Sequence, residues 1–381
     1  MRRRAGCGPG RRSSSPYPEV LYNLQALRFI AALLVVLVHT APHLQASGGP
    51  APLAATLAAI GHYGVDLFFV ISGFVIWHST QAQRGGAVAL RFAQRRAIRI
   101  YSGYWPYFLL ALLLAGWLTP ELLARKDLLG SLLLIRTPIP ELLIPVSWTL
   151  TFELYFYALF ALLLPLPRHW RLPALLLLAA LVIGVQGYAL LQLGGYSRET
   201  FREVSQLYRL FASPYLLEFI GGALLAIHYQ RLQVHFLPLL LLALALLLFA
   251  LHYQSALPER SLAPGYYALQ RVALFGSSAL FLIWGLLVLE QRGWQLLPPV
   301  SRYLGAISYS LYLSHTILLS ALAALGGHAW IAASGHPISS YLLVILLIVL
   351  YSALHYHLAE RPLHRWMQKK TDFAHPQQQT A

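Results

Sequence analysis

Long apolar runs constrain the fold of this chain more than any other feature of its sequence. Residues 235–253, HFLPLLLLALALLLFALHY, contain no Asp, Glu, Lys or Arg, and a run of about 20 apolar residues can cross a bilayer as a helix. Charged residues make up 11% of the 381 residues and hydrophobic residues 58%, whereas soluble domains carry about 25% charged residues. The sequence therefore predicts an integral membrane protein.

Ten runs of this kind predict an all-α fold, a polytopic membrane helix bundle of about ten transmembrane helices. The leucine-rich segment between the third and fourth runs is expected to lie partly in the membrane interface as a short amphipathic stretch. The expected spans are residues 21–41, 57–80, 101–118, 147–164, 172–193, 209–229, 235–253, 266–290, 303–325 and 337–360.

The basic residues predict which side of the membrane each loop faces, because cytoplasmic loops carry an excess of Lys and Arg. With the N-terminus inside, 19 of the 28 Lys and Arg residues fall on the cytoplasmic side, eight on the opposite side, and Arg28 within the first span. We therefore expect both termini in the cytoplasm and a multi-pass protein of the inner, cytoplasmic membrane. Orientation and anionic membrane lipids explain the net charge of +15 better than nucleic acid does.

Three parts are expected along the chain. Residues 1–20 are basic and rich in Ser, Pro and Gly, which predicts a disordered cytoplasmic N-terminus. Residues 21–363 form the transmembrane domain, and residues 364–381 form a short basic and polar cytoplasmic tail.

Ionisable side chains inside the spans are functional candidates, because an unpaired charge in the bilayer costs several kcal/mol. The strongest candidates are His39, Asp66 in HYGVDLFFVISGF, and Glu153 in SWTLTFELYFYALF. No pair of histidines is accompanied by the carboxylate of a helical zinc motif, so no metal site is predicted. Further ionisable residues in or near the spans are Glu218, His228, His315, His355 and His357.

Arg28 and His39 share the first span, in LRFIAALLVVLVHT. Eleven residues separate them, which is roughly 16 Å along a helix and close to three full turns, so both side chains lie on one face. The pair is explained equally well by a snorkelling arginine and a histidine that caps the helix C-terminus, or by two parts of one site.

A second basic group, LRFAQRRAIRIYSGYW, carries Arg95, Arg96 and Arg99 just before the third span. Taken alone, the cluster is better explained as a positive-inside signal. The alternative is a dock for a cytosolic phosphate-bearing molecule, because the planar guanidinium binds phosphate bidentately.

The ordered set of motifs resembles acyltransferase family 3, whose members O-acylate carbohydrates and other hydroxylated compounds. The resemblance covers about residues 21–363, and although each motif is weak alone, the ordered set is highly specific. Its motifs are the Arg, ten residues, His of Arg28 and His39, then GVDLFFVISGF, RRAIRIY with Arg96 and Arg99, SWTLTFELYFY, SYSLYLSHT and the terminal ERP at residues 360–362.

This resemblance implies an acyl-CoA donor that enters from the cytoplasm, with acetyl-CoA as the default, and no permanently bound cofactor. It implies a catalytic His39, and a donor site formed by Arg28, Arg96 and Arg99. The acceptor hydroxyl is expected on a carbohydrate, a lipid-linked sugar or a glycosylated metabolite. Other possible site residues are Ser72, Trp148, Tyr312 and His315.

His39 is the expected general base, because an imidazole with an unperturbed pKa of about 6.5 accepts a proton at neutral pH. Asp66 or Glu153 is expected to orient the ring, and direct transfer is favoured over an acyl-histidine intermediate. The rival interpretation is a transporter or flippase, in which the intramembrane acids relay protons and the arginines bind lipid phosphate.

Overall fold

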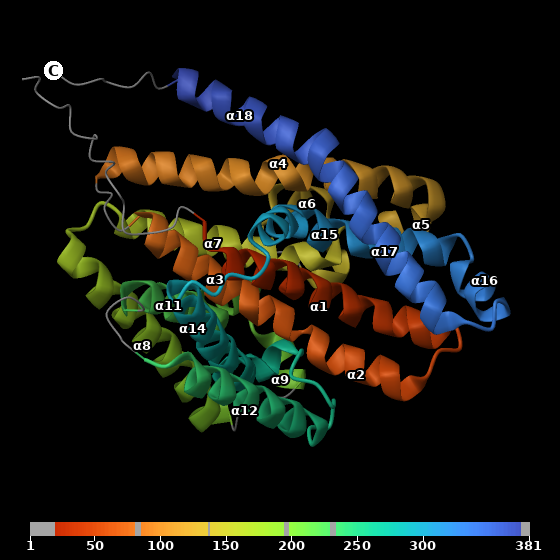
Figure 1. The fold of residues 1–381 in the computed structure, drawn as a ribbon, viewed down its shortest axis with the longest axis horizontal. Coiled ribbons are helices and arrows are strands. Elements are labelled where there is room, and N and C mark those ends of the chain that lie inside the picture. Colours follow the sequence, from red (N-terminus) through yellow and green to blue (C-terminus); the bar gives the residue numbers. More distant parts are fainter. Residues whose placement is uncertain (1–19, 81–84, 136–137, 194–197, 229–233, 375–381) are drawn as a thin grey trace, which may run out of the picture.

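The computed structural model describes residues 20–80, 85–135, 138–193, 198–228 and 234–374. Within these ranges the regular elements are helices and no strand is found, and ten helical stretches are long and apolar enough to cross a membrane (Figure 1). The expected all-α bundle of about ten spans is therefore confirmed. The proposed N-terminal part lies outside the described ranges except for its last residue, and the end of the tail lies outside them as well.

The ten spans are formed by single helices or by short helices that follow one another. In chain order they are α1 (Tyr22–Ala46), α2 (Ala51–Gly61) with α3 (Tyr63–Thr80), α4 (Gly86–Leu118), η2 (Pro145–Ser147) with α7 (Trp148–Leu163), α8 (Arg168–Leu193), α10 (Gln206–Phe211) with α11 (Tyr215–His228), α12 (Phe236–Ser255), η3 (Gly265–Tyr267) with α13 (Ala268–Arg271), η4 (Val272–Gly276) and α14 (Ser277–Gln291), α15 (Pro298–Ala324), and α17 (Pro337–His355) with η5 (Tyr356–Glu360) and α18 (Arg361–Ala374). The connections contain α5 (Pro120–Leu123), α6 (Leu128–Leu133), η1 (Ile139–Glu141), α9 (Arg198–Glu203) and α16 (Gly327–Ala333).

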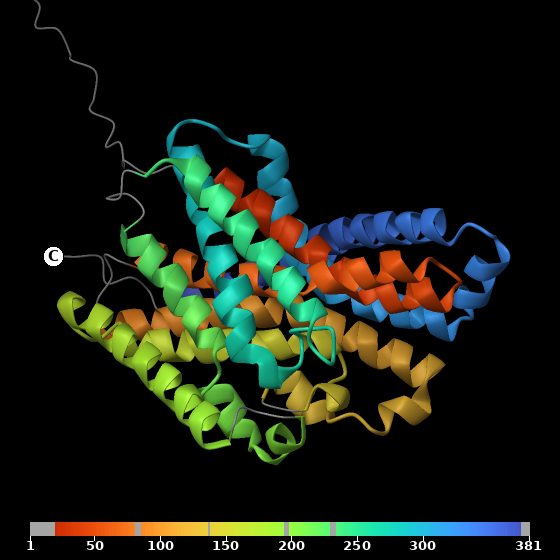
Figure 2. The ribbon, with the colours of Figure 1, turned by 90° about the horizontal axis from the view of Figure 1, so that it is seen from below.

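Helix α4 is longer than the expected third span. It has 33 residues and begins at Gly86 rather than at residue 101, so it is about 50 Å long and exceeds the roughly 30 Å hydrocarbon core. The arginine cluster therefore lies on a rigid helix and not in a loop. Helix α18 packs along this basic part of α4 (Figure 1), and Figure 2 shows α4 running across most of the bundle.

The segment between α4 and α7 folds back along α4. The hydroxyls of Tyr101 and Tyr104 donate to the carbonyls of Leu133 and Ser131, each at 2.7 Å. Tyr104 lies 14 residues before the end of α4, so α6 contacts α4 roughly 21 Å along the axis from that end. Ser131 and Ile144 are fully buried, whereas leucines on the other side of α6 are exposed. The place of this segment in the membrane interface stays a prediction.

Helix α1 forms the centre of the bundle, between α3 and α15. Glycines allow the close approaches: a Cβ added to Gly64 would lie 2.3 Å from the Ala31 carbonyl oxygen, and one added to Gly73 would lie 1.9 Å from that of Phe219. Small residues serve this purpose in membrane bundles, so the glycines of the second span are explained by packing. Helices α8 and α12 lie at the periphery (Figure 1).

Candidate active site

The three arginines expected to bind a donor converge on one cavity. Arg28 from α1 and Arg96 and Arg99 from α4 line a hollow of about 190 Å³, together with Glu153 from α7. We call it the arginine cavity. Its other polar lining residues are Ser72, Thr149, Tyr157, Ser308, Tyr309 and Tyr312.

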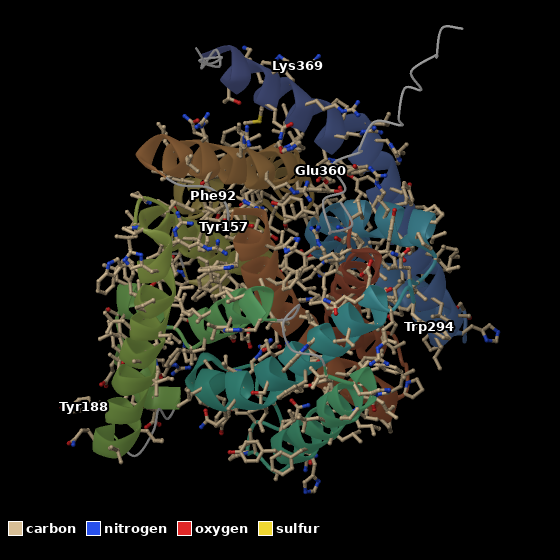
Figure 3. The ribbon with its side chains drawn as sticks, turned by 60° about the vertical axis from the view of Figure 1, so that its left-hand side comes forward. Phe92, Tyr157, Tyr188, Trp294, Glu360 and Lys369 are labelled. Atoms are coloured by element: carbon tan, nitrogen blue, oxygen red, sulfur yellow. The ribbon has the colours of Figure 1, made fainter. Side chains whose placement is uncertain are left out.

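Two of these arginines are held in place by protein groups. Arg99 Nη1 lies 2.9 Å from Glu360 Oε1, and Ser310 Oγ donates to the other oxygen of this carboxylate at 2.7 Å. Arg96 Nη2 donates to Ser79 Oγ at 3.2 Å, and its guanidinium lies over the rings of Phe92 and Tyr157 at 5.4 and 5.5 Å. Figure 3 shows Phe92 and Tyr157 close together beneath α4.

Arg28 differs from both. Among the residues that the structure describes, none forms a hydrogen bond or ion pair with its guanidinium, although Glu153 lines the same cavity. Glu153 instead accepts hydrogen bonds from Ser72, at 3.3 Å, and from Tyr157. The arginine cavity therefore contains a cation that is available to an anionic ligand.

A wider basic groove adjoins the arginine cavity. It has a volume of about 670 Å³ and is lined by Arg91 and Arg95 in addition to Arg96 and Arg99, which belong to both hollows. His364 of α18 lies on its other side, and the His364 Nδ1 atom is 3.0 Å from Ser102 Oγ. We call this hollow the basic groove.

Sequence reasoning missed Arg91 and His364 as lining residues. Arg91, Arg95 and Arg99 are spaced four residues apart, so the helical period alone places them on one face. His364 had no comparable signal, because its position depends on α18 packing back onto α4.

His39 pairs with His315. His315 Nε2 lies 3.2 Å from His39 Nδ1, which is also 2.8 Å from the Val35 carbonyl oxygen, and His315 Nδ1 is 3.2 Å from the Leu311 carbonyl oxygen. A carbonyl oxygen only accepts, so both Nδ1 atoms carry the proton when the rings are neutral. His39 Nε2 is then the unprotonated nitrogen, with a lone pair that can accept a proton.

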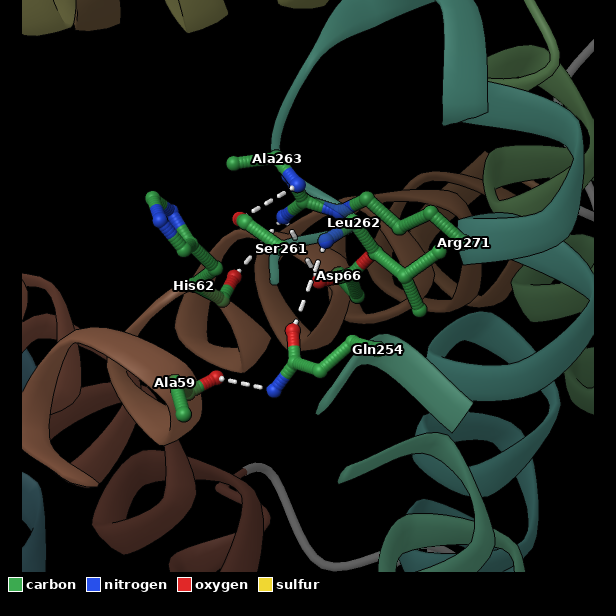
Figure 4. A network of polar contacts seen from close by, with 8 residues as sticks. All are labelled: Ala59, His62, Asp66, Gln254, Ser261, Leu262, Ala263 and Arg271. Carbon is green, nitrogen blue, oxygen red and sulfur yellow. Dashed lines mark hydrogen bonds and ion pairs between the residues drawn. The ribbon is translucent and has the colours of Figure 1, made fainter. Parts of the chain in front are cut away.

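The expected contact between His39 and a carboxylate is absent among the described side chains, and this is a correction. Both oxygens of Asp66 accept hydrogen bonds from Arg271, from Nε at 2.9 Å and from Nη2 at 2.8 Å. Arg271 Nη2 also donates to the His62 carbonyl oxygen at 2.8 Å (Figure 4). Asp66 is therefore paired with Arg271 and not with His39. Glu153 lines the arginine cavity and does not contact His39 either.

Arg271 was itself misplaced by the sequence analysis, which counted it with the outer basic residues. It is 2% exposed and lies inside the eighth span. A lone arginine within an apolar run was the available signal, since such a charge requires a partner.

The remaining candidates divide into two groups. Ser72 and Tyr312 line the arginine cavity; the Tyr312 hydroxyl donates to the Val146 carbonyl oxygen at 2.9 Å and contacts Thr149 Oγ1 at 2.7 Å. The Tyr312 ring lies 6.0 Å from that of His315 and so joins the histidine pair to the cavity. Trp148 instead packs against Phe69, Phe152 and Tyr215 in an aromatic cluster.

A helical membrane bundle with a histidine pair, of which His315 is fully buried, next to a cavity lined by arginines and a carboxylate, has the composition of a membrane-embedded enzyme. The family model described as "Acyltransferase domain" matches residues 21–357. The chain belongs to this family, acyltransferase family 3, and is a multi-pass membrane acyltransferase.

A curated relative supports this assignment. The chain is 34% identical over 277 residues to the exopolysaccharide production protein ExoZ of Rhizobium meliloti (strain 1021), covering 70% of this chain and 79% of the relative. No solved structure gives a significant match.

Proposed function

We propose that the protein transfers an acyl group, by default acetyl, from acyl-CoA to a hydroxyl of a carbohydrate acceptor. The observation that carries this proposal is that Arg96 and Arg99 belong to both the basic groove and the arginine cavity. A wide basic groove that leads into a narrow cavity suits a donor with a bulky phosphorylated end and a thin arm. The exopolysaccharide named in the relative supports a carbohydrate acceptor.

The phosphates of the donor are assigned to the basic groove. Arg91, Arg95, Arg96 and Arg99 offer guanidinium groups along one side of it, and guanidinium groups bind phosphate oxygens bidentately. Arg28 lines the arginine cavity but not the basic groove, and its guanidinium forms no hydrogen bond or ion pair with a described residue, so it is assigned to the inner phosphate or to the thioester oxygen.

His39 is assigned as the general base. The acceptor oxygen bonds to the thioester carbonyl carbon, the hydroxyl proton passes to His39 Nε2, and the carbon–sulfur bond breaks. The proton then passes from His39 to the CoA thiolate, which yields free CoA and the ester. The imidazolium formed in between donates from Nδ1 to the Val35 carbonyl and to His315 Nε2, and both acceptors stabilise it.

Glu153 and Asp66 are assigned different roles. Glu153 lines the arginine cavity and orients Tyr157, whose ring lies beneath Arg96. Asp66 is a positioning residue, because it holds Arg271 and, through it, the His62 carbonyl at the break between α2 and α3. Direct transfer between the two substrates is proposed rather than an acyl-histidine.

The basic groove is proposed to face the cytoplasm, with both termini on that side of the inner membrane. Helix α18 beside the groove carries Arg361, Arg365, Lys369 and Lys370, and such segments are attracted to the anionic cytoplasmic leaflet. This orientation gives cytosolic acyl-CoA direct access to the groove.

The function is tested by mass spectrometry of envelope glycans and secreted metabolites from cells that lack the gene and are complemented with variants. We expect wild type and His252→Ala, a matched change at an exposed histidine, to restore an acyl ester that His39→Ala does not restore. Restoration by a stably folded His39→Ala variant would contradict the mechanism. Solute uptake or lipid flipping without acyl-CoA consumption would favour the rival transporter.

A further inference from the structure

A second pocket lies at the other end of the helices that form the arginine cavity. It has a volume of about 400 Å³ and lies between α1, α4, α15 and the segment that precedes α7. We call it the outer pocket. Its polar lining residues are His43, Thr119, Thr316 and Ser320, and its apolar wall includes Leu114, Leu118, Leu122 and Leu143.

The polar groups of the outer pocket include one without a partner. Thr316 is 8% exposed, and its hydroxyl forms no hydrogen bond with any residue in the described part of the chain. His43 Nδ1 lies 2.8 Å from His328 Nε2, which fixes the orientation of the His43 ring. A buried hydroxyl left unpaired is destabilising because it has lost its hydrogen bonds to water, so a ligand that hydrogen-bonds to Thr316 is favoured.

Position along helix α1 places the histidine pair between the two hollows. Arg28 lines the arginine cavity and His43 lines the outer pocket, with His39 between them. His43 is one turn beyond His39, about 6 Å along the axis and on the same face.

Two further segments repeat this order. On α15, Ser308 and Tyr312 line the arginine cavity, His315 follows, and Thr316 and Ser320 line the outer pocket. Around the start of α7, residues 149 and 150 line the arginine cavity, whereas residues 143 and 145 line the outer pocket. On α1 and α15 the histidine pair therefore lies, in chain order, between residues that line the two hollows, although neither His39 nor His315 lines either hollow, and the segment around the start of α7 also passes from one hollow to the other.

We propose that the outer pocket binds the acceptor, with its reactive hydroxyl directed past Thr316 toward His39 Nε2. This inference rests on the proposed function, since it assigns the second substrate of the same reaction. Donor and acceptor then enter from opposite ends of the bundle and meet at the histidine pair, so neither has to leave before the other binds.

The lining of the outer pocket also defines the class of acceptor. A few hydroxyl and imidazole groups lie beside a wall of leucine and alanine side chains. A free oligosaccharide leaves this apolar wall exposed to water. The lipid chain of a lipid-linked sugar covers the wall, and binding then gains the free energy of burying apolar surface. The outer pocket therefore fits the sugar end of a lipid-linked saccharide.

Cysteine protection tests this assignment without requiring catalysis. The full chain with Cys7→Ser is placed in nanodiscs of palmitoyl-oleoyl-phosphatidylethanolamine, and the rate of maleimide labelling is measured for Ser320→Cys in the pocket. The matched control is Leu325→Cys, which is exposed at the end of the same helix and does not line the pocket. The probes are octyl β-D-glucopyranoside, below its micellar concentration, and methyl β-D-glucopyranoside.

We expect octyl glucoside to protect Ser320→Cys at a concentration at least about tenfold lower than methyl glucoside, because it adds seven methylene groups of apolar burial. Adding Thr316→Val is expected to weaken this protection about fivefold, the loss of one hydrogen bond. Equal protection by both glucosides would overturn the lipid-linked class. No protection of Ser320→Cys, or equal protection of Leu325→Cys, would overturn the acceptor site.

A donor measurement in the same nanodiscs separates this inference from the proposed function. Acetyl-CoA binding is expected to be unchanged by Thr316→Val, which lies outside the arginine cavity. If wild type fails to bind acetyl-CoA, the proposed function fails, whatever the glucosides do. If wild type binds acetyl-CoA and the glucosides do not protect, only the acceptor site fails.

Discussion

In the described part of the chain, two arginine–carboxylate pairs are similar in distance and opposite in surroundings. Arg99 and Glu360 are 2.9 Å apart, with side-chain exposures of 33% and 1%, whereas Arg271 and Asp66 are 2.8 Å apart, with exposures of 2% and 0%. The first pair borders the arginine cavity and the basic groove, and neither residue of the second pair lines either of these hollows.

In the proposed function, this difference separates an arginine that binds a ligand from one that supports the fold. Arg99 keeps part of its guanidinium open to both hollows, so a ligand phosphate can bind while Glu360 holds the other part. The guanidinium nitrogens of Arg271 instead donate to Asp66 and the His62 carbonyl. We therefore expect the first pair to serve the site and the second pair to serve the fold.

The largest expected effect comes from breaking the buried pair of Arg271 and Asp66. Asp66→Ala leaves Arg271 buried and unpaired, so we expect it to lower the free energy of unfolding by about 3–5 kcal/mol. Thermal unfolding in detergent measures this loss, and Asp66→Leu combined with Arg271→Met is expected to recover much of it. A stable but inactive Asp66→Ala protein would instead show that Asp66 acts in the chemistry.

A substitution in the partly exposed pair of Arg99 and Glu360 is expected to change mainly the affinity for the donor. Arg99→Gln removes a charged hydrogen bond worth about 1.5–3 kcal/mol, which raises the Kd for acetyl-CoA at least about tenfold. Calorimetry on wild type and variant measures this Kd, and Arg302→Gln, at a surface arginine outside both hollows, is the control. An unchanged Kd would remove Arg99 from the donor site.

Arg28 sharpens the comparison because its guanidinium forms no hydrogen bond or ion pair with a described residue, although Glu153 lines the same cavity. Arg28→Gln is expected to raise the Kd for acetyl-CoA about tenfold while leaving thermal stability unchanged or slightly increased. The same calorimetry and unfolding measurements apply. A loss of stability without a change in Kd would mean that Arg28 supports the fold instead.

Glu218 is expected to give the smallest effect. It lies near Arg271 and Asp66 with both carboxyl oxygens buried, and a buried carboxylate beside the Asp66 carboxylate is far costlier than the neutral acid. Glu218→Gln mimics the neutral acid, so we expect a change in unfolding free energy within about 1 kcal/mol. A much larger loss would show that its negative charge is needed beside Arg271.

The sequence predicted the elements that depend on local pattern. Apolar runs located ten spans, and the helical period brought Arg28 onto the same face as His39 and placed the arginines of α4 in one cluster. These properties require only the rise and turn of a helix.

Pairings across the bundle were beyond the same reasoning. Asp66 meets Arg271 across 205 residues and His39 meets His315 across 276, and nothing in the local pattern selects these partners over the carboxylates that were expected. The contact of α6 with α4 was missed for the same reason, because it depends on the hydroxyls of Tyr101 and Tyr104. Sequence therefore located the arginines that line the cavity better than it located the partner of His39.

The proposed mechanism can be tested by a structure with a non-hydrolysable thioether analogue of acetyl-CoA. We expect its phosphates to be bound by Arg96 and Arg99 in the basic groove, and its acyl carbon to be exposed toward His39 Nε2 with room for an acceptor oxygen at about 3–3.5 Å from it. An analogue bound elsewhere, or one whose acyl group points away from the histidine pair, would rule out His39 as the base that acts on this donor.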